Sequence, residues 1–154
     1  MLPATANRVE RNTAESVNER IRRETEERVA RTAAGGLTAI GDRLAELDRE
    51  WDIERYLETM APSLTLAGLT LGLTVNRKWL LLPIAVQAFF LQHALQGWCP
   101  PVPILRRMGF RTQYEIDQER YALKALRGDF ANVKKSRGKT RGDRTAKAVE
   151  AVAK

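Results

Sequence analysis

The segment from Trp79 to Trp98 constrains this chain more than any other, because its residues, WLLLPIAVQAFFLQHALQGW, carry no formal charge. An α-helix rises about 1.5 Å per residue, so a helix of this length covers roughly 30 Å, the thickness of the hydrocarbon core of a bilayer. Tryptophans at both ends suit the two water–lipid interfaces, where an indole buries its ring and keeps its N–H hydrated. The segment therefore predicts a membrane-spanning helix.

A second, weaker apolar run precedes it, Met60–Val75 (MAPSLTLAGLTLGLTV). As a helix it is about 24 Å long, so it needs Leu57 or Asn76 to complete a span. Pro62 stands near its start, where a helix can begin without losing a backbone hydrogen bond. Only Asn76, Arg77 and Lys78 separate the two runs, and so short a connection predicts an antiparallel hairpin of two transmembrane helices.

Small residues predict how these two helices pack. Gly68 and Gly72 form a GxxxG pair that shares a face with Thr65, and small residues let a second helix approach closely in lipid. On the second helix, two alanines and then two glutamines follow one another in a stripe along one face. Burying a glutamine side chain in lipid would be costly unless it is hydrogen-bonded across a helix interface. We expect this stripe to meet the glycine face; the predicted packing residues are Thr65, Gly68, Gly72, Ala85, Ala88, Gln92 and Gln96.

The first 59 residues are polar, with ten basic and thirteen acidic side chains. Residues 8–33 read as a helix with a thin apolar seam, either a solvated arm or a helix that needs a partner, and Gly35-Gly36 ends it. Apolar residues at heptad spacing then predict an amphipathic helix that packs on a neighbour, a second copy or the bilayer surface. These apolar positions are Leu37, Ile40, Leu44, Leu47 and Trp51.

After the second span, prolines at 100, 101 and 103 end the helix. Residues 104–110 read as an interfacial elbow in which Arg106 and Arg107 face lipid phosphate, together with Trp79 and Trp98 at headgroup depth. Thr112-x-x-Glu115 is a capping box that predicts a helix to about Arg127, closed by Gly128.

The remaining residues form a basic tail. Residues 132–154 carry eight basic and two acidic groups. Their excess of basic groups accounts for nearly all of the chain's net charge of +7. We expect this tail to be disordered up to Thr145, with a short helix beyond. It has no aromatic side chains to stack on bases, so an anionic lipid surface is the simpler partner and nucleic acid is the alternative.

Candidate reactive groups are few. A single cysteine, Cys99, and a single histidine, His93, exclude a disulfide framework and a multi-ligand metal site, and we expect no cofactor. Cys99 is either an interfacial packing residue or a functional thiol. His93 is either a satisfied side chain at a helix interface or a proton relay, and no acid within the two apolar runs accompanies it.

These features predict an all-α integral membrane protein with four regions. They are amphipathic cytoplasmic helices (1–59), a two-helix transmembrane hairpin (60–99), an elbow and cytoplasmic helix (100–130) and a mostly disordered basic tail (131–154). Near the spans, basic residues are more numerous in the two tails than in the connecting loop. Because basic flanking segments stay in the cytoplasm, this distribution predicts that both termini are cytoplasmic. The alternative is a soluble bundle whose buried core is the apolar hairpin. The charged N-terminal residues contain no cleavable secretory signal.

A short set of motifs resembles a known family. The run LGLTVN (Leu71 to Asn76), a hydrophobic helix, Gly97-x-Cys99 and a basic exit at Arg106 and Arg107 are similar to the YgaP-like inner-membrane domain family. The match covers residues 60–110. It implies a bacterial inner-membrane helical hairpin that self-associates and occurs alone or beside rhodanese sulfurtransferase domains. No rhodanese active-site loop is present, so sulfur transfer by this chain is not implied.

Two classes of function follow. The first is a non-enzymatic membrane anchor or scaffold that forms a homodimer through the Gly68/Gly72 and Gln92/Gln96 faces and presents its polar helices to a cytoplasmic protein. The second is a thiol-dependent sulfur or redox component using Cys99, or an export component for small anions using the Gln92, His93 and Gln96 face. Only the association of the family with rhodanese domains supports the second class, and that is analogy.

Overall fold

The computed structural model describes residues 4–131, 133 and 141–153, and every regular element among them is a helix. These residues fall into two compact units. The hairpin unit comprises the described residues up to Arg22 and Trp51–Glu115, and the second unit comprises Arg23–Glu50 and the described residues from Ile116 on. The prediction of an all-helical chain is confirmed.

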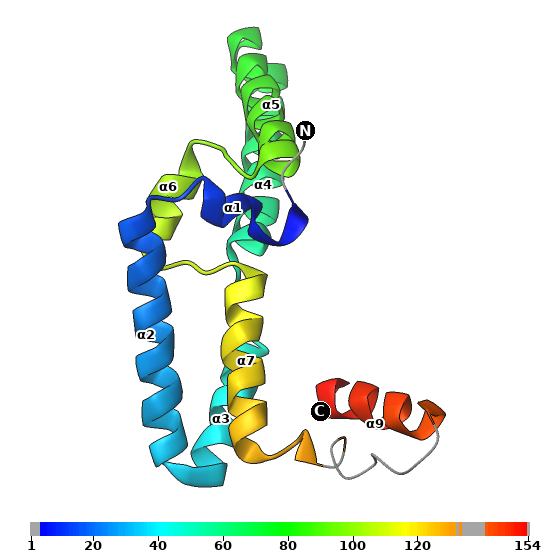
Figure 1. Ribbon diagram of the computed structural model, residues 1–154. Helices are drawn as coiled ribbons and strands as arrows, with labels where there is room; N and C mark the ends of the chain where they lie inside the picture. Colours follow the sequence, from blue (N-terminus) through cyan, green and yellow to red (C-terminus); the bar gives the residue numbers. More distant parts are fainter. Residues whose placement is uncertain (1–3, 132, 134–140, 154) are drawn as a thin grey trace. The chain divides into compact units, whose positions relative to one another are not determined.

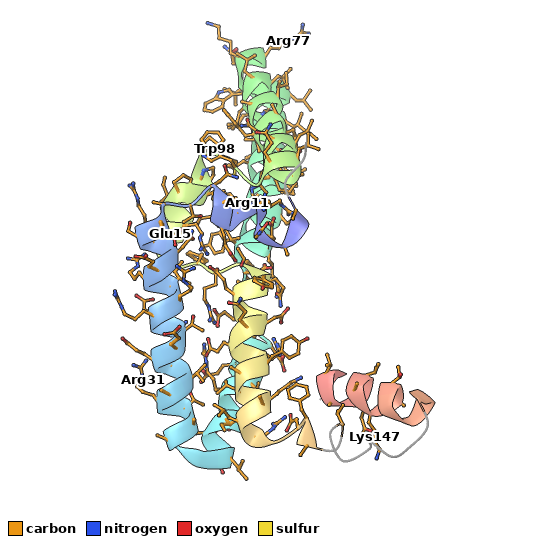
Figure 2. The ribbon with its side chains drawn as sticks, viewed as in Figure 1. Arg11, Glu15, Arg31, Arg77, Trp98 and Lys147 are labelled. Atoms are coloured by element: carbon orange, nitrogen blue, oxygen red, sulfur yellow. The ribbon has the colours of Figure 1, made fainter. Side chains whose placement is uncertain are left out.

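Two antiparallel helices dominate the hairpin unit. Helix α4 (Ile53–Thr74) and helix α5 (Leu81–Gln96) lie side by side, joined by the short 3-10 helix η2 (Arg77–Leu80) (Figure 1). The Asn76 side chain opens this connection by accepting a 2.9 Å hydrogen bond from the Lys78 amide. Figure 2 shows Arg77 at the tip of the hairpin and Trp98 at its base.

Helix α4 begins earlier than the sequence predicted. Asp52 caps it by accepting a 2.8 Å hydrogen bond from the Arg55 amide, and the helix then runs through Pro62, which lies inside it. The early start has a packing reason, because Ile53 and Leu57 are buried in the core of the hairpin unit. The polar first turns and the apolar run are therefore one continuous helix, with no break at residue 60.

Only one helical stretch within the described ranges is long and apolar enough to cross a membrane. It is Arg77–Gln96, and only 11% of its apolar window is buried within the protein. Helix α4 does not reach the same standard, because Glu58 and several threonines and glycines lower the mean hydropathy of its apolar part. Length and composition thus support one membrane-spanning candidate, and the second span of the predicted hairpin is not established by them.

The base of the hairpin holds the unit's apolar core. Short helices α1 (Arg8–Arg11) and α6 (Pro101–Arg107) bring Val9, Val102 and Leu105 against Ile53, Leu57 and Cys99. The 3-10 helix η1 (Thr5–Asn7) leads into α1. Because these side chains come from both ends of the unit's sequence, the core ties the N-terminal segment and the elbow to the start of α4.

The second unit is built around the predicted heptad seam. Helix α2 (Glu15–Ala34) ends before Gly35, and α3 (Gly36–Leu47) follows. Its Ile40, Leu44 and Leu47 are buried against Ile116 and Leu123 of α7 (Gln113–Arg127). The two ends of the predicted seam, Leu37 and Trp51, are instead exposed. The seam is therefore confirmed over its central three positions.

Helix α7 starts and stops where the sequence predicted. The Thr112 amide donates to the Glu115 carboxylate (2.8 Å), and the Glu115 amide donates to the Thr112 hydroxyl (3.2 Å), which is the reciprocal pattern of a capping box. Gly128, at φ +90°, ends the helix in the left-handed conformation that glycine adopts without steric cost. Both helix-end predictions are confirmed.

One charged cluster is buried in the second unit. The fully buried Glu119 accepts hydrogen bonds from Arg43 (2.8 Å) and Arg28 (3.3 Å), and the bond to Glu119 raises the pKa of Arg43 although its burial opposes this. Removing either arginine would leave a buried carboxylate short of positive charge, which is costly.

The basic tail is helical over the part that the structure describes. Helix α9 (Arg141–Ala153) begins four residues before Thr145, where the sequence predicted disorder to end. Ala151 is buried, and the Lys124 ammonium donates a 2.7 Å hydrogen bond to the Val152 carbonyl. The prediction of disorder for residues 134–140 lies outside the described residues.

Candidate functional site

The end of α5 is fixed by a glycine. Gly97 has φ +79°, and its amide donates to the His93 carbonyl (2.7 Å), so it ends the helix in the left-handed conformation. A Cβ atom at this position would lie 2.5 Å from the Arg8 carbonyl. The Asn12 side-chain amide also donates to the Gln96 carbonyl (2.8 Å). The N-terminal segment is thereby held directly against the end of α5.

This contact assembles a polar group that we call the base cluster: the half-buried Arg8 and Glu54 and the buried His93. His93 is 1% exposed, and its Nε2 donates a 2.8 Å hydrogen bond to Oε2 of Glu54. The other oxygen of that carboxylate, Oε1, accepts a 2.9 Å hydrogen bond from Arg8. The base cluster thus joins α1, α4 and α5 through one carboxylate.

The pKa of Glu54 reflects these two partners. Burial of its carboxyl group opposes ionisation and raises the pKa, but the hydrogen bond from His93 and the charges of His93 and Arg8 outweigh burial, so the pKa lies below its ordinary value. Glu54 is therefore a carboxylate at neutral pH. An ionised carboxylate that holds one ring nitrogen of a histidine fixes which ring nitrogen faces away from it.

Cys99 is not joined to the base cluster by a hydrogen bond. Its side chain is 3% exposed and belongs to the apolar core with Val9, Ile53 and Leu57. Nδ1 of His93, the ring nitrogen that does not face Glu54, is buried and has no well-aligned hydrogen-bond partner among the described atoms.

An apolar pocket of about 300 Å³ adjoins the thiol. It lies between α4 and α5 and the start of α6, and Cys99 is one of its lining residues. The remaining lining residues are apolar: Leu57, Met60, Ala61, Leu64, Leu82, Ala85, Val86, Phe89, Phe90, Pro100 and Pro101.

A second buried polar cluster surrounds Arg106. Its guanidinium is fully buried and donates to both carboxylate oxygens of Glu115 (2.6 and 2.7 Å), to Asn18 (3.0 Å) and to Thr13 (3.3 Å). Burial, together with the nearby charge of Glu115, raises the pKa of Glu10. Arg106 is thus committed to the protein interior and is not available to the lipid headgroups with which the sequence analysis associated it.

The predicted glycine face is in contact with α5 in the same chain. A Cβ atom on Gly68 would lie 2.5 Å from Cδ of Pro83, and one on Gly72 would clash with the side chain of Leu80. The partners of the two glycines are therefore Pro83 and Leu80 near the start of α5, rather than the predicted stripe further along that helix. Thr65 also bonds within the chain, since its hydroxyl accepts a 2.8 Å hydrogen bond from Gln87.

The stripe itself is mostly exposed. Ala85, Ala88 and Gln96 are exposed and Gln92 is half-buried. Of the other predicted interfacial residues, Trp79 is 45% exposed near the hairpin tip, Trp98 is half-buried at the base (Figure 2), and Arg107 is exposed. The structure thus leaves the stripe and the two tryptophans accessible, while it uses the glycines internally.

Glu54, Arg8 and Asn18 were not predicted as functional-site residues. Each lies in a segment rich in charged side chains, where nothing distinguishes a buried polar residue from a solvated one. One signal was available for Glu54, because it occupies the turn of α4 that carries the buried Ile53 and Leu57. Glu54 lies before the apolar run of α4, and in an antiparallel hairpin this position is next to the end of α5. A charged residue there can pair with a polar side chain near the end of α5.

The chain matches no family model, no curated protein and no solved structure. The resemblance of residues 60–110 to the YgaP-like family therefore rests on the short motifs quoted above and remains a hypothesis. Within the part of the chain that the structure describes, no group of three or more histidine, cysteine or acidic side chains is placed to hold a metal ion.

Proposed function

We propose that the protein is a membrane anchor whose α4–α5 hairpin inserts into a bilayer while its polar helices dock a cytoplasmic partner. One observation carries the proposal: large apolar side chains are exposed along the hairpin from the middle of α4 to the end of α5. These residues are Leu64, Leu66, Leu69, Leu73, Val75, Trp79, Leu81, Ile84, Phe89, Leu91 and Leu95.

The exposure of these side chains argues against the soluble alternative. In a soluble bundle the most apolar helix is the core and is mostly buried, but only 11% of the apolar window in Arg77–Gln96 is buried. Soluble proteins rarely expose contiguous apolar patches larger than a few hundred Å². Lipid is the cover that a two-helix apolar surface of this length requires.

If both helices insert, the part of α4 from Met60 on must cross the bilayer. Glu54 and Glu58 then lie at the membrane–water interface. In this arrangement Arg77 and Lys78 lie on one side of the membrane. Arg43, Arg49, Arg55, Arg107 and Arg111 lie on the other, and the excess of arginine there favours the cytoplasm. A bacterial inner membrane is what the family resemblance implies.

Self-association is the remaining part of this proposal. Because Gly68 and Gly72 contact Pro83 and Leu80 in the same chain, the exposed stripe of Ala88, Gln92 and Gln96 is the better surface for a second copy. Small residues permit close approach, and amide side chains hydrogen-bond across helices in lipid at about 1 kcal/mol each. A homodimer through this stripe would pair glutamines with glutamines.

Membrane fractionation with two matched variants tests the anchor. The full chain is expected to stay with membranes after carbonate washing. Phe89→Arg, in the middle of α5, is expected to reduce the membrane fraction strongly, because arginine at the centre of a span costs about 3 kcal/mol or more. Leu126→Arg, at another exposed apolar residue but in α7, is the control and is expected to change nothing. Wild-type protein in the soluble fraction, or equal behaviour of the two variants, would refute the proposal.

A thiol-dependent sulfur or redox role is the second candidate, favoured by the position of Cys99 in the wall of the apolar pocket. An export path for small anions along Gln92, His93 and Gln96 has less support, because the carboxylate of Glu54 occupies the Nε2 side of His93. Loss of resistance to sulfur stress in Cys99→Ser, at normal protein level, would support the thiol role. Full activity of that variant would dismiss it.

A further inference from the structure

The tip of the hairpin carries a second, smaller pocket of mixed character. Its volume is about 240 Å³, and it lies where α4 ends and η2 begins. The wall combines the polar side chains of Thr74, Asn76 and Arg77 with the apolar side chains of Val75 and Leu80. A water molecule in the liquid occupies roughly 30 Å³, so the pocket has room for a group of several heavy atoms. Such a group would meet polar side chains and hydrocarbon together.

Two cations lie at this tip without an acidic partner. Arg77, which lines the pocket, and the adjacent Lys78 are both exposed, and neither forms an ion pair with any residue that the structure describes. The sequence contains no aspartate or glutamate between Glu58 and Glu115. Glu58 lies near the start of α4, about 24 Å along the helix from its end, which is too far for pairing. The tip is therefore positively charged, and an anion is the ligand that complements it.

The apolar surface around the two cations indicates which kind of anion fits. Beside the pocket, Leu73 is 82% exposed, Val75 is 70% exposed and Trp79 is 45% exposed. A free phosphate ion would leave this hydrocarbon uncovered, whereas a phospholipid brings a phosphate and acyl chains to the same place. Tryptophan next to arginine and lysine is also a combination that anchors the end of a helix at the water–lipid interface.

We propose that the hairpin tip binds an anionic phospholipid, with the lipid phosphate on Arg77 and Lys78 and the start of the acyl chains against Leu73, Val75 and Leu80. Arginine offers a planar pair of N–H donors to a phosphate, and lysine adds a second charge. A basic residue near an anionic membrane surface strengthens binding about fivefold, so the two together favour an anionic over a zwitterionic lipid roughly 25-fold. The inference rests on the proposed insertion of the hairpin and adds to it a lipid preference at one end.

Quenching of Trp79 fluorescence by brominated lipids tests this preference in the full-length protein. Trp51→Phe and Trp98→Phe leave Trp79 as the only tryptophan, and the chain is reconstituted in vesicles that contain brominated phosphatidylglycerol or brominated phosphatidylcholine. We expect the relative binding constant at Trp79 to be roughly 25-fold higher for phosphatidylglycerol, and Arg77→Gln or Lys78→Gln to lower this ratio about fivefold each. Equal quenching by the two lipids would overturn the lipid site and leave insertion standing. Quenching by neither lipid would refute both.

Two threonines on one face of α4 provide a matched pair for the pocket. Thr74 lines the pocket and Thr70, one turn earlier, does not; both are exposed, and each hydroxyl donates to the carbonyl four residues before it (2.7 and 2.9 Å). Thr74→Phe fills the pocket without changing the charge, so we expect it to lower the preference for phosphatidylglycerol, whereas Thr70→Phe leaves it unchanged. If the two variants behave alike, the pocket does not hold the lipid and the proposal is wrong.

Two further controls separate the tip from general membrane charge and from a soluble anion. In a chain whose only tryptophan is Trp98, at the base of the hairpin (Figure 2), Arg77→Gln is expected to leave the lipid preference unchanged. An equal loss of preference at Trp98 and Trp79 would contradict a local site. Inorganic phosphate should weaken the preference at Trp79 no more than sodium chloride of the same ionic strength, and specific displacement by phosphate would show that the site takes a free anion instead. Circular dichroism of each variant confirms that its helices are retained.

Discussion

Replacing Gly68 by alanine tests the packing of the hairpin most sharply. In an exposed helix interior, glycine to alanine stabilises by about 1 kcal/mol. At Gly68 the added Cβ would lie 2.5 Å from Cδ of Pro83 and 3.3 Å from Cβ of Leu82. Because Pro83 is a rigid ring on the neighbouring helix, α4 and α5 must move apart, and overpacking of this kind costs about 1–3 kcal/mol. We expect a net loss of about 1 kcal/mol.

Gly41 provides the matched control. It lies inside α3, and a Cβ atom there would meet nothing within 4 Å, so Gly41→Ala should stabilise its helix by about 1 kcal/mol. Gly72→Ala should fall between the two, because the side chain of Leu80 that it would meet is flexible. Hydrogen exchange measured by mass spectrometry reports each helix separately. A destabilisation of about 1 kcal/mol would speed exchange in α4 and α5 roughly fivefold. Slower exchange in α4 for Gly68→Ala would refute the close approach at Pro83.

Three further predictions concern the buried polar groups and the exposed stripe. Arg106→Met should destabilise the hairpin unit by about 3–5 kcal/mol, measured by thermal unfolding in detergent, because Glu115 would remain buried without its partner; Arg107→Met, at an exposed neighbour, should change stability by less than about 0.5 kcal/mol. Because the pKa of Glu54 is lower in the folded protein than in the unfolded chain, its stabilising contribution is present above the ordinary carboxyl pKa and is lost as the pH falls through the folded value; the stability of Glu54→Gln should therefore change less than that of the wild-type chain between neutral pH and pH about 3, and parallel curves would contradict the pairing. Ala88→Leu combined with Gln92→Leu should shift the oligomer towards monomer in crosslinking or light-scattering measurements, whereas an unchanged oligomer would rule out association through the stripe.

The sequence predicted the helices better than their partners. Helix ends that depend on local chemistry were predicted correctly, as at Gly35, at the Thr112–Glu115 capping box and at Gly128. The start of α4 was not, because proline favours the first turn of a helix and disfavours its interior, yet α4 begins at Ile53 and runs through Pro62. Tertiary burial, which a local pattern does not reveal, decided between them.

The candidate site shows the same division. Cys99 and His93 stand out as the only residues of their kinds, so the sequence could nominate them. It could not pair His93 with Glu54, which lies 39 positions earlier in a charged segment, nor show that Arg106 turns inward to Glu115. Charged side chains are usually solvated, and only long-range packing makes these exceptions.

Cysteine labelling in intact cells tests the membrane hairpin most directly. In a Cys99→Ser background, single cysteines are placed by Arg77→Cys at the hairpin tip and by Thr5→Cys near the N-terminus, and a membrane-impermeant maleimide is applied before and after lysis. A hairpin that spans the bilayer with both termini in the cytoplasm predicts labelling of the Arg77 position in intact cells and of the Thr5 position only after lysis. Labelling of the Thr5 position in intact cells, or of neither position until lysis, would contradict this topology.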